Sequence, residues 1–253
     1  MLTFSFTQEA SISKLIKQSK TVVATTFLFT LAACGSDNNS NNAVEPPIVT
    51  PPPPPAEYSY TVTVSNLTHA QPLSPIAVVL HGDSKMWMIG EPSSQALEKL
   101  AESGDNSEFI SDDNAIAANS SEGVLLPGLS TTIDVSTTDR NATFFTAATM
   151  LVNTNDAFTG LTGVDISTMA INDTQSWNLN VYDSGTEANS EAMGTIPGPA
   201  DGGTGFDEMR DDVDFVAMHS GVVSQDDGLS NSVLTQAHRF DNPAIKLTIT
   251  RTK

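Results

Sequence analysis

The chain has 253 residues, of which 30 are acidic and 11 are basic, so its formal net charge is −19 at neutral pH. Proteins that bind nucleic acid need basic surfaces to neutralise phosphates, so this balance argues against a nucleic-acid partner. The same charge argues against electrostatic docking on anionic lipid headgroups. The length is sufficient for one large domain or two small ones with a core of useful size.

The N-terminal segment has the pattern of a secretory signal. Lys14, Lys17 and Lys20 precede an apolar stretch at residues 22–31, and small residues follow it. A membrane-spanning helix needs about 20 apolar residues, so the stretch is too short for a transmembrane anchor. We therefore expect this segment to be absent from the mature protein.

Cys34 is the only cysteine of the chain, and it directly follows Leu31, Ala32 and Ala33. This arrangement resembles the bacterial lipobox, and the resemblance implies cleavage before Cys34 and acylation of its amine and thiol. The alternative is a buried free thiol. We expect residues 1–33 to be a lipoprotein signal peptide, with the mature chain attached to a membrane through lipid on Cys34.

Residues 34–56 have the composition of a tether. Their first part is polar and rich in asparagine, and residues 51–55 are consecutive prolines. Such a proline run favours a stiff polyproline II spacer that extends about 3.1 Å per residue. We expect no packed structure in this segment, which would hold a folded domain at residues 57–253 away from the membrane.

The folded domain begins with an alternating segment, in which Tyr58, Tyr60, Val62 and Val64 are separated by small polar residues. Period-two alternation of aromatic and β-branched residues predicts a half-buried strand. Similar patterns predict six more strands at residues 76–81, 131–136, 144–153, 176–182, 213–218 and 245–250. The predicted fold class is therefore all-β, an antiparallel sandwich.

One helix is predicted at residues 93–103. Ser93 or Ser94 can cap its start, its apolar positions share one face, and Gly104 can end it. Long polar loops connect the predicted strands, most notably residues 184–212. Long loops on a sandwich usually serve a function or lack a fixed structure.

The segment that carries the most chemistry closes the predicted strand at residues 176–182. Asp183 and Glu187 lie four residues apart around Gly185, which can adopt a positive φ and fold both carboxylates toward one point. Calcium prefers six to eight oxygen ligands, so this loop could supply two or three and a neighbouring loop the others. The alternative is an ordinary solvated acidic loop.

Several stretches, in the same order along residues 58–253, resemble the spondin N-terminal domain. They are residues 72–75, 90–94, 97–102, 104–107, 155–160, 182–187 and 238–244. The resemblance implies a C2-like antiparallel β-sandwich of about eight strands that binds Ca²⁺ through loops at one end. It also implies three calcium ligands, Asp156, Asp183 and Glu187. Glu187 stands where the family usually has Asp, and the cysteines of the animal domain are absent here.

Other signals are weaker. Residues 202–210 fit the calcium-binding nonapeptide of β-rolls, but that structure needs stacked copies and there is only one. A second, weak calcium site between Asp201 and Asp214 stays open. The four histidines lack the close spacing of metal ligands, and we expect His81 and His219 to be structural hydrogen-bonding residues. No Gly-x-Ser-x-Gly motif supports a hydrolase.

Together these features predict a non-enzymatic, calcium-binding lipoprotein of the cell envelope. Gly35 and Ser36 do not resemble an inner-membrane retention signal, so we expect the outer membrane, on its periplasmic or outer face. The expected role is adhesion to extracellular matrix, polysaccharide or an envelope protein. The alternatives are a calcium-dependent enzyme acting on envelope glycans or lipids, and a structural assembly subunit.

Overall fold

The computed structural model describes residues 54–82 and 85–253. The predicted signal peptide, Cys34 and the tether up to residue 53 lie outside the described residues, and residues 54–57 are exposed and belong to no strand or helix. None of the helices in the described part of the chain has the length and apolar character needed to cross a membrane.

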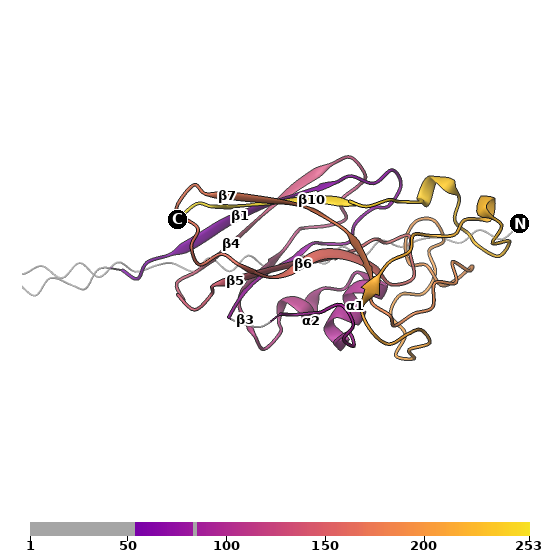
Figure 1. Cartoon of the computed structure of the whole chain (residues 1–253), viewed down its shortest axis with the longest axis horizontal. Helices are drawn as coiled ribbons and strands as arrows, with labels where there is room; N and C mark the ends of the chain where they lie inside the picture. The colour runs from indigo at the N-terminus through magenta and orange to yellow at the C-terminus, as the bar shows by residue number, and fades with distance from the viewer. Residues whose placement is uncertain (1–53, 83–84) are drawn as a thin grey trace, which may run out of the picture. The chain divides into compact units, whose positions relative to one another are not determined.

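The described chain forms ten strands in two antiparallel sheets, so the prediction of an all-β sandwich is confirmed (Figure 1). The four-stranded sheet has the order β4 (Ser130–Thr137), β1 (Tyr58–Asn66), β10 (Ile245–Arg251) and β7 (Thr174–Leu179). The six-stranded sheet has the order β3 (Ala115–Ser120), β2 (Ala77–His81), β5 (Phe144–Met150), β6 (Ala157–Asp165), β8 (Val181–Asp183) and β9 (Ala217–Met218). The remaining elements are α1 (Gln95–Ser103), α2 (Ser107–Ile110) and two 3₁₀ turns, η1 (Gln225–Asp227) and η2 (Gln236–His238).

The first and last strands lie side by side in the four-stranded sheet. Val62 of β1 pairs with Ile249 of β10, and both side chains are fully buried. From Tyr60 to Val64 and from Ile245 to Ile249 the inward side chains are apolar and the outward ones are Thr or Lys, which is the alternation that the sequence shows. These inward side chains and those of the six-stranded sheet form the main core between the two layers.

Strand β2 is buried on both faces, because helices α1 and α2 cover the outer face of the six-stranded sheet and α2 lies against β2. Val78 points into the main core, whereas Val79 packs with Leu97 and Leu100 of α1 in a second cluster. The helix prediction is confirmed at both ends. Ser94 Oγ accepts a hydrogen bond from the backbone N–H of Leu97 at 3.2 Å, and Gly104 ends the helix at φ 72°.

The strand predicted at residues 176–182 is two strands in two different sheets. Leu179 ends β7 beside β10, and Val181 begins β8 beside β6. Between them, the carbonyl oxygen of Asn180 accepts a hydrogen bond from Thr159 Oγ1 at 2.8 Å, so the chain crosses from one layer to the other. Strands β3 and β6 were not predicted either, so the described residues form ten strands where the sequence patterns predicted seven and the family resemblance implied about eight.

Long loops gather at one end of the sandwich, at the end where β8 and β9 lie (Figure 1). The connection at residues 184–216 contains only an isolated bridge at Ala192, which confirms the long loop predicted at residues 184–212. The strand predicted at residues 213–218 is wrong except for β9, which covers only Ala217–Met218. A third small apolar cluster, formed by Ile196, Val222 and Leu234, anchors these loops. The predicted acidic residues lie among them.

Candidate metal centre

The three predicted ligands come from two adjacent strands and the loop that follows them. Asp156 directly precedes β6, and Asp183 is the last residue of β8. Because Ala157 pairs with Asp183 in the antiparallel register of these strands, Asp156 lies next to the end of β8. Glu187 follows four residues later, in the loop that leaves β8. The fold therefore places all three acidic residues at the same end of the sandwich.

Asp156 is the centre of this arrangement, and none of its surface is exposed. Its Oδ2 accepts hydrogen bonds from Ser184 Oγ at 2.8 Å, from the backbone N–H of Thr186 at 2.9 Å and from that of Glu187 at 3.2 Å. The loop after β8 thus wraps around one carboxylate oxygen. Such bonds favour the ionised form of the acid.

The other oxygen of Asp156, Oδ1, is buried and has no hydrogen-bond partner among the described residues. Burial raises the pKa of Asp156 to about 7, and the negative charge of Asp183 adds to this effect. Both causes outweigh the hydrogen bonds to Oδ2, which act in the opposite direction. Nearly all buried carboxylate oxygens in proteins have a hydrogen-bond donor or a bound ion as a partner, so Oδ1 is an exception that calls for an explanation.

Glu187 shows the same pattern. Its Oε1 accepts a hydrogen bond from Asn155 Nδ2 at 2.8 Å, whereas the buried Oε2 has no partner in the described part of the chain. Burial raises the pKa of Glu187 to about 7, with smaller contributions from the charges of Glu102, Asp156 and other carboxylates. Two acids with buried, unpartnered oxygens therefore lie within electrostatic reach of each other.

Asp183 is differently bonded. Its Oδ1 accepts a hydrogen bond from the backbone N–H of Gly185 at 2.7 Å, and its Oδ2 accepts one from Asn189 Nδ2 at 2.6 Å. Asn189 Oδ1 in turn lies 3.0 Å from Nε2 of His219, whose Nδ1 accepts from the backbone N–H of Gly221 at 2.9 Å. His219 is therefore neutral with its proton on Nε2, and burial lowers its pKa.

Gly185 allows the loop to take this course. Its φ is +74°, which is the positive value that a glycine at this position was expected to allow. A Cβ at Gly185 would lie 2.2 Å from the carbonyl oxygen of Phe215, so the start of the loop after β8 and the residues just before β9 are in backbone contact. No residue with a side chain fits there without displacing one of the two segments.

Three further residues of the site were not expected from the sequence. Asn155 connects the loops, since its Nδ2 also contacts Thr195 Oγ1 at 2.9 Å and its Oδ1 accepts from the backbone N–H of Glu191 at 3.2 Å. Glu191 is buried, has one unpartnered oxygen and a raised pKa because of burial. Glu102 of α1 is also buried with a pKa raised by burial. Of these three residues, only Asn155 could have been found from the sequence, because it directly precedes the predicted ligand Asp156.

Arg210 ties the long loop to α1. Its guanidinium donates to Glu98 Oε2 at 2.6 Å, to Asp214 Oδ1 at 2.6 Å and to the carbonyl oxygen of Ser93 at 2.8 Å. Glu98 is almost fully buried, so this ion pair neutralises a charge that would otherwise be buried alone. Because the guanidinium is bound to Glu98 and Asp214, it does not pair with Asp156 or Glu187.

As they stand, no three His, Cys, Asp or Glu side chains of the described residues converge closely enough to hold a metal ion. Asp156 lies within electrostatic reach of both Asp183 and Glu187, but the oxygens of Asp183 accept hydrogen bonds from the protein. The donor set nevertheless fits a hard cation, since it offers only carboxylate oxygens and two of them are buried without a donor. Binding would need Asp183 to exchange its bond with Asn189 for the ion.

The weaker signals of the sequence have local explanations. Asp201 Oδ2 accepts hydrogen bonds from the backbone N–H of Gly194 at 2.6 Å and of Ile196 at 3.3 Å, which close a turn. Asp214 pairs with the guanidinium that also binds α1. His81 is fully buried, with Nε2 2.8 Å from Thr146 Oγ1, so its prediction as a structural hydrogen-bonding residue is confirmed. His219 is confirmed in the same role.

No protein-family model matches this chain, and no curated protein matches it.

Proposed function

We propose that this chain is a calcium-binding, lipid-anchored protein of the cell envelope with a spondin-like sandwich and a non-enzymatic role in surface interaction. The observation that carries the proposal is the pair of buried, unpartnered oxygens, Asp156 Oδ1 and Glu187 Oε2. Ionised carboxylates in such surroundings need a compensating positive charge. Because the nearby arginine is bound elsewhere, a cation is the simplest partner for them.

Calcium suits this site better than a transition metal. Asp156, Asp183 and Glu187 are oxygen ligands, and backbone carbonyls and waters can complete the six to eight ligands that calcium takes. His219 is bonded through both ring nitrogens, so no free imidazole competes for a softer metal. A bound calcium would supply positive charge between the loops and hold the loop after β8 against the start of β6.

An enzyme is the second candidate, since Asp156 and Glu187 both have pKa values raised to about 7, as general acids often do. The burial of Asp156 argues against this function. Its surface is fully covered and its Oδ2 holds three loop donors, so no substrate can reach the carboxylate without opening the loop. A role in binding a cation therefore explains the perturbed acids better than catalysis does.

The interaction role follows from the arrangement of anchor, tether and loops. Lipid on Cys34 and the proline-rich tether would present the sandwich away from the membrane, and calcium would fix the loops at one end of it. Adhesion to matrix, polysaccharide or an envelope protein is the function that such a display best serves. An assembly subunit would need the same architecture but would form defined oligomers.

Isothermal titration of calcium into the full chain carrying Cys34→Ser, which blocks acylation, tests the metal site. We expect one saturable calcium site, no comparable heat from magnesium, and loss of the site in Asp183→Asn. Asp201→Asn is the matched control and should keep it. If Asp183→Asn and the control bind calcium as the parent chain does, the proposed ligand set is wrong.

A further inference from the structure

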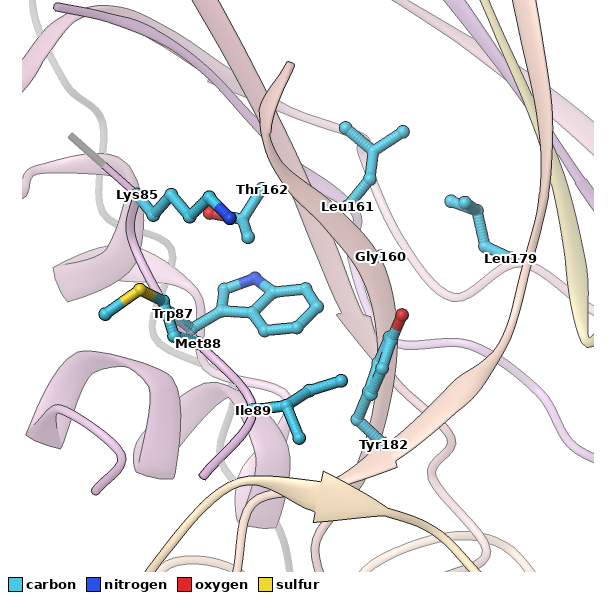
Figure 2. Close-up of a pocket in the computed structure, with 9 residues that line it drawn as sticks. All are labelled: Lys85, Trp87, Met88, Ile89, Gly160, Leu161, Thr162, Leu179 and Tyr182. Atoms are coloured by element: carbon cyan, nitrogen blue, oxygen red, sulfur yellow. The ribbon is translucent and has the colours of Figure 1, made fainter. Parts of the chain in front are cut away.

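A hollow with a volume of about 470 Å³ opens between β6 and the chain that crosses from β7 to β8 (Figure 2). Its exposed walls are mainly apolar. They include Trp87 from the segment after β2, Leu161 of β6, and Leu179 and Tyr182 on either side of the crossing. A hollow of this size is within the range of protein sites for small molecules.

The topology explains why the hollow exists. Strand β8 pairs with β6 only along Ala157–Thr159. The residues just before β8 belong to β7, in the other sheet, so they do not extend this pairing. Strand β7 is the edge of the four-stranded sheet, so it does not pair with the remainder of β6. Leu161 and Leu179, which belong to the main core, face the gap where the two layers separate (Figure 2). The hollow is thus an apolar opening toward the core.

Trp87 gives the hollow an unused hydrogen-bond donor. Its side chain is only 8% exposed and is fixed by Phe158 in an edge-on contact at 5.1 Å and by Tyr182 at 4.7 Å between ring centroids. The indole Nε1–H has no acceptor among the described residues. Figure 2 shows the nitrogen edge of the ring on the side of the hollow that Lys85 and Thr162 occupy. A buried donor without an acceptor destabilises the fold, so an acceptor supplied by a ligand would explain it.

Lys85 gives the hollow a positive charge. Its side chain is exposed and lines the hollow, and none of the ion pairs within the described part of the chain involves it. The Lys85 ammonium and the unpartnered indole N–H of Trp87 are two donors that line the same hollow, and both suit an anionic acceptor. The ligand that matches the walls and the donors together has an apolar body and one negatively charged acceptor group.

We propose that this hollow binds a free alkyl carboxylate of medium chain length. Its alkyl chain would lie against Leu161, Leu179 and the ring of Trp87, and its carboxylate would accept hydrogen bonds from the Lys85 ammonium and the Trp87 indole N–H. The site shares no residue with the carboxylate cluster at Asp156. A test of carboxylate binding in the hollow is therefore independent of whether the chain binds calcium.

Nuclear magnetic resonance of the full Cys34→Ser chain tests the proposal with octanoate, decanoate and dodecanoate as probes, below their micelle concentrations. The chain has two tryptophans, and Trp177→Phe assigns their indole N–H signals. We expect a saturable downfield shift of the Trp87 signal only. Each added methylene should strengthen binding about fourfold until the hollow is full.

Two lysine variants test the carboxylate. Lys85→Met should weaken decanoate binding about tenfold or more and leave decanol binding unchanged. Lys246→Met, an exposed lysine on β10, should change neither. The proposal is overturned if the Trp87 signal does not saturate, if Trp177 shifts equally, if decanol binds the parent chain as tightly as decanoate, or if the two lysine variants behave alike.

Discussion

Replacing Asp156 by Asn should stabilise the metal-free protein at pH 8 while removing its response to calcium. Asn retains an oxygen for the three donors from Ser184, Thr186 and Glu187, but it carries no charge. Without a bound cation, the ionised carboxylate destabilises the folded state. The variant therefore separates the cost of the buried charge from the packing of the loop.

The magnitude follows from the pKa of Asp156. Folding raises it from 3.8 to about 7, and each pKa unit corresponds to about 1.4 kcal/mol, so the ionised group costs about 4 kcal/mol at pH 8. Because the folded protein holds this proton more tightly, stability is full below about pH 4 and is lost as pH rises to about 7. The side-chain NH₂ group of the Asn is buried without an acceptor, which costs about 2 kcal/mol and reduces the stabilisation by that amount. A net stabilisation of about 2 kcal/mol remains at pH 8.

Urea unfolding of the full Cys34→Ser chain in excess chelator measures this difference. We expect the Asp156→Asn variant to exceed the parent by about 2 kcal/mol at pH 8 and to match it near pH 5, where the raised pKa of Asp156 costs the parent about as much as the buried amide costs the variant. With calcium at pH 8 the order should reverse, since only the parent binds the ion. A variant that is less stable than the parent in chelator at pH 8 would refute the argument from buried charge.

Three other predictions concern the loop around the site. Calcium affinity should rise with pH between about 6 and 8, because binding displaces protons from acids whose pKa values are raised to about 7; titration at three pH values checks this. Arg210→Met should cost about 3 kcal/mol in urea unfolding, since it leaves the buried Glu98 without its partner. Gly185→Ala should cost at least about 2 kcal/mol because its Cβ would meet Phe215 at φ +74°. Gly202→Ala, at φ +71° with open space around it, should cost only about 1 kcal/mol.

The sequence predicted strands where hydrophobic periodicity is strong. Strands β1 and β10 alternate cleanly, so both were found almost to the residue. Strand β6 was missed because Ala157–Asp165 contains Gly160 and Gly163 and no regular alternation. Gly160 is required there, since a Cβ would lie 2.0 Å from the carbonyl oxygen of Ala147 on the neighbouring strand. The formation of β6 is therefore determined by its tertiary contacts and not by the local strand preference of its residues.

The change of sheet at Asn180 is a second feature that the sequence pattern could not predict. The pattern around it is continuous, and nothing local indicates that the chain changes sheets at this residue. The change is fixed by bonds to distant segments, since Asn242 Oδ1 accepts the backbone N–H of Val181 at 2.8 Å and Leu179 accepts that of Ala244 at 2.9 Å. Such long-range hydrogen bonds leave no signal in the pattern of a single segment.

The candidate site could be predicted only in part for the same reason. Asp183, Gly185 and Glu187 are close in sequence, so local turn chemistry indicated them. Asp156 came from the resemblance to the spondin family alone, and its proximity follows from the register of β6 and β8. Glu102 and Glu191 come from α1 and from the long loop, and no spacing in the sequence relates them to the other carboxylates.

Thermal unfolding of the full Cys34→Ser chain at pH 8, in calcium, in magnesium and in excess chelator, tests the central claim most directly. Calcium at about a hundred times its dissociation constant adds about 2.7 kcal/mol, which should raise the Tm by about 5 to 10 °C over the chelated protein. Magnesium should produce much less, and Asp183→Asn should abolish the rise. Equal Tm values in calcium and chelator would contradict the account and leave the buried carboxylates without a metal.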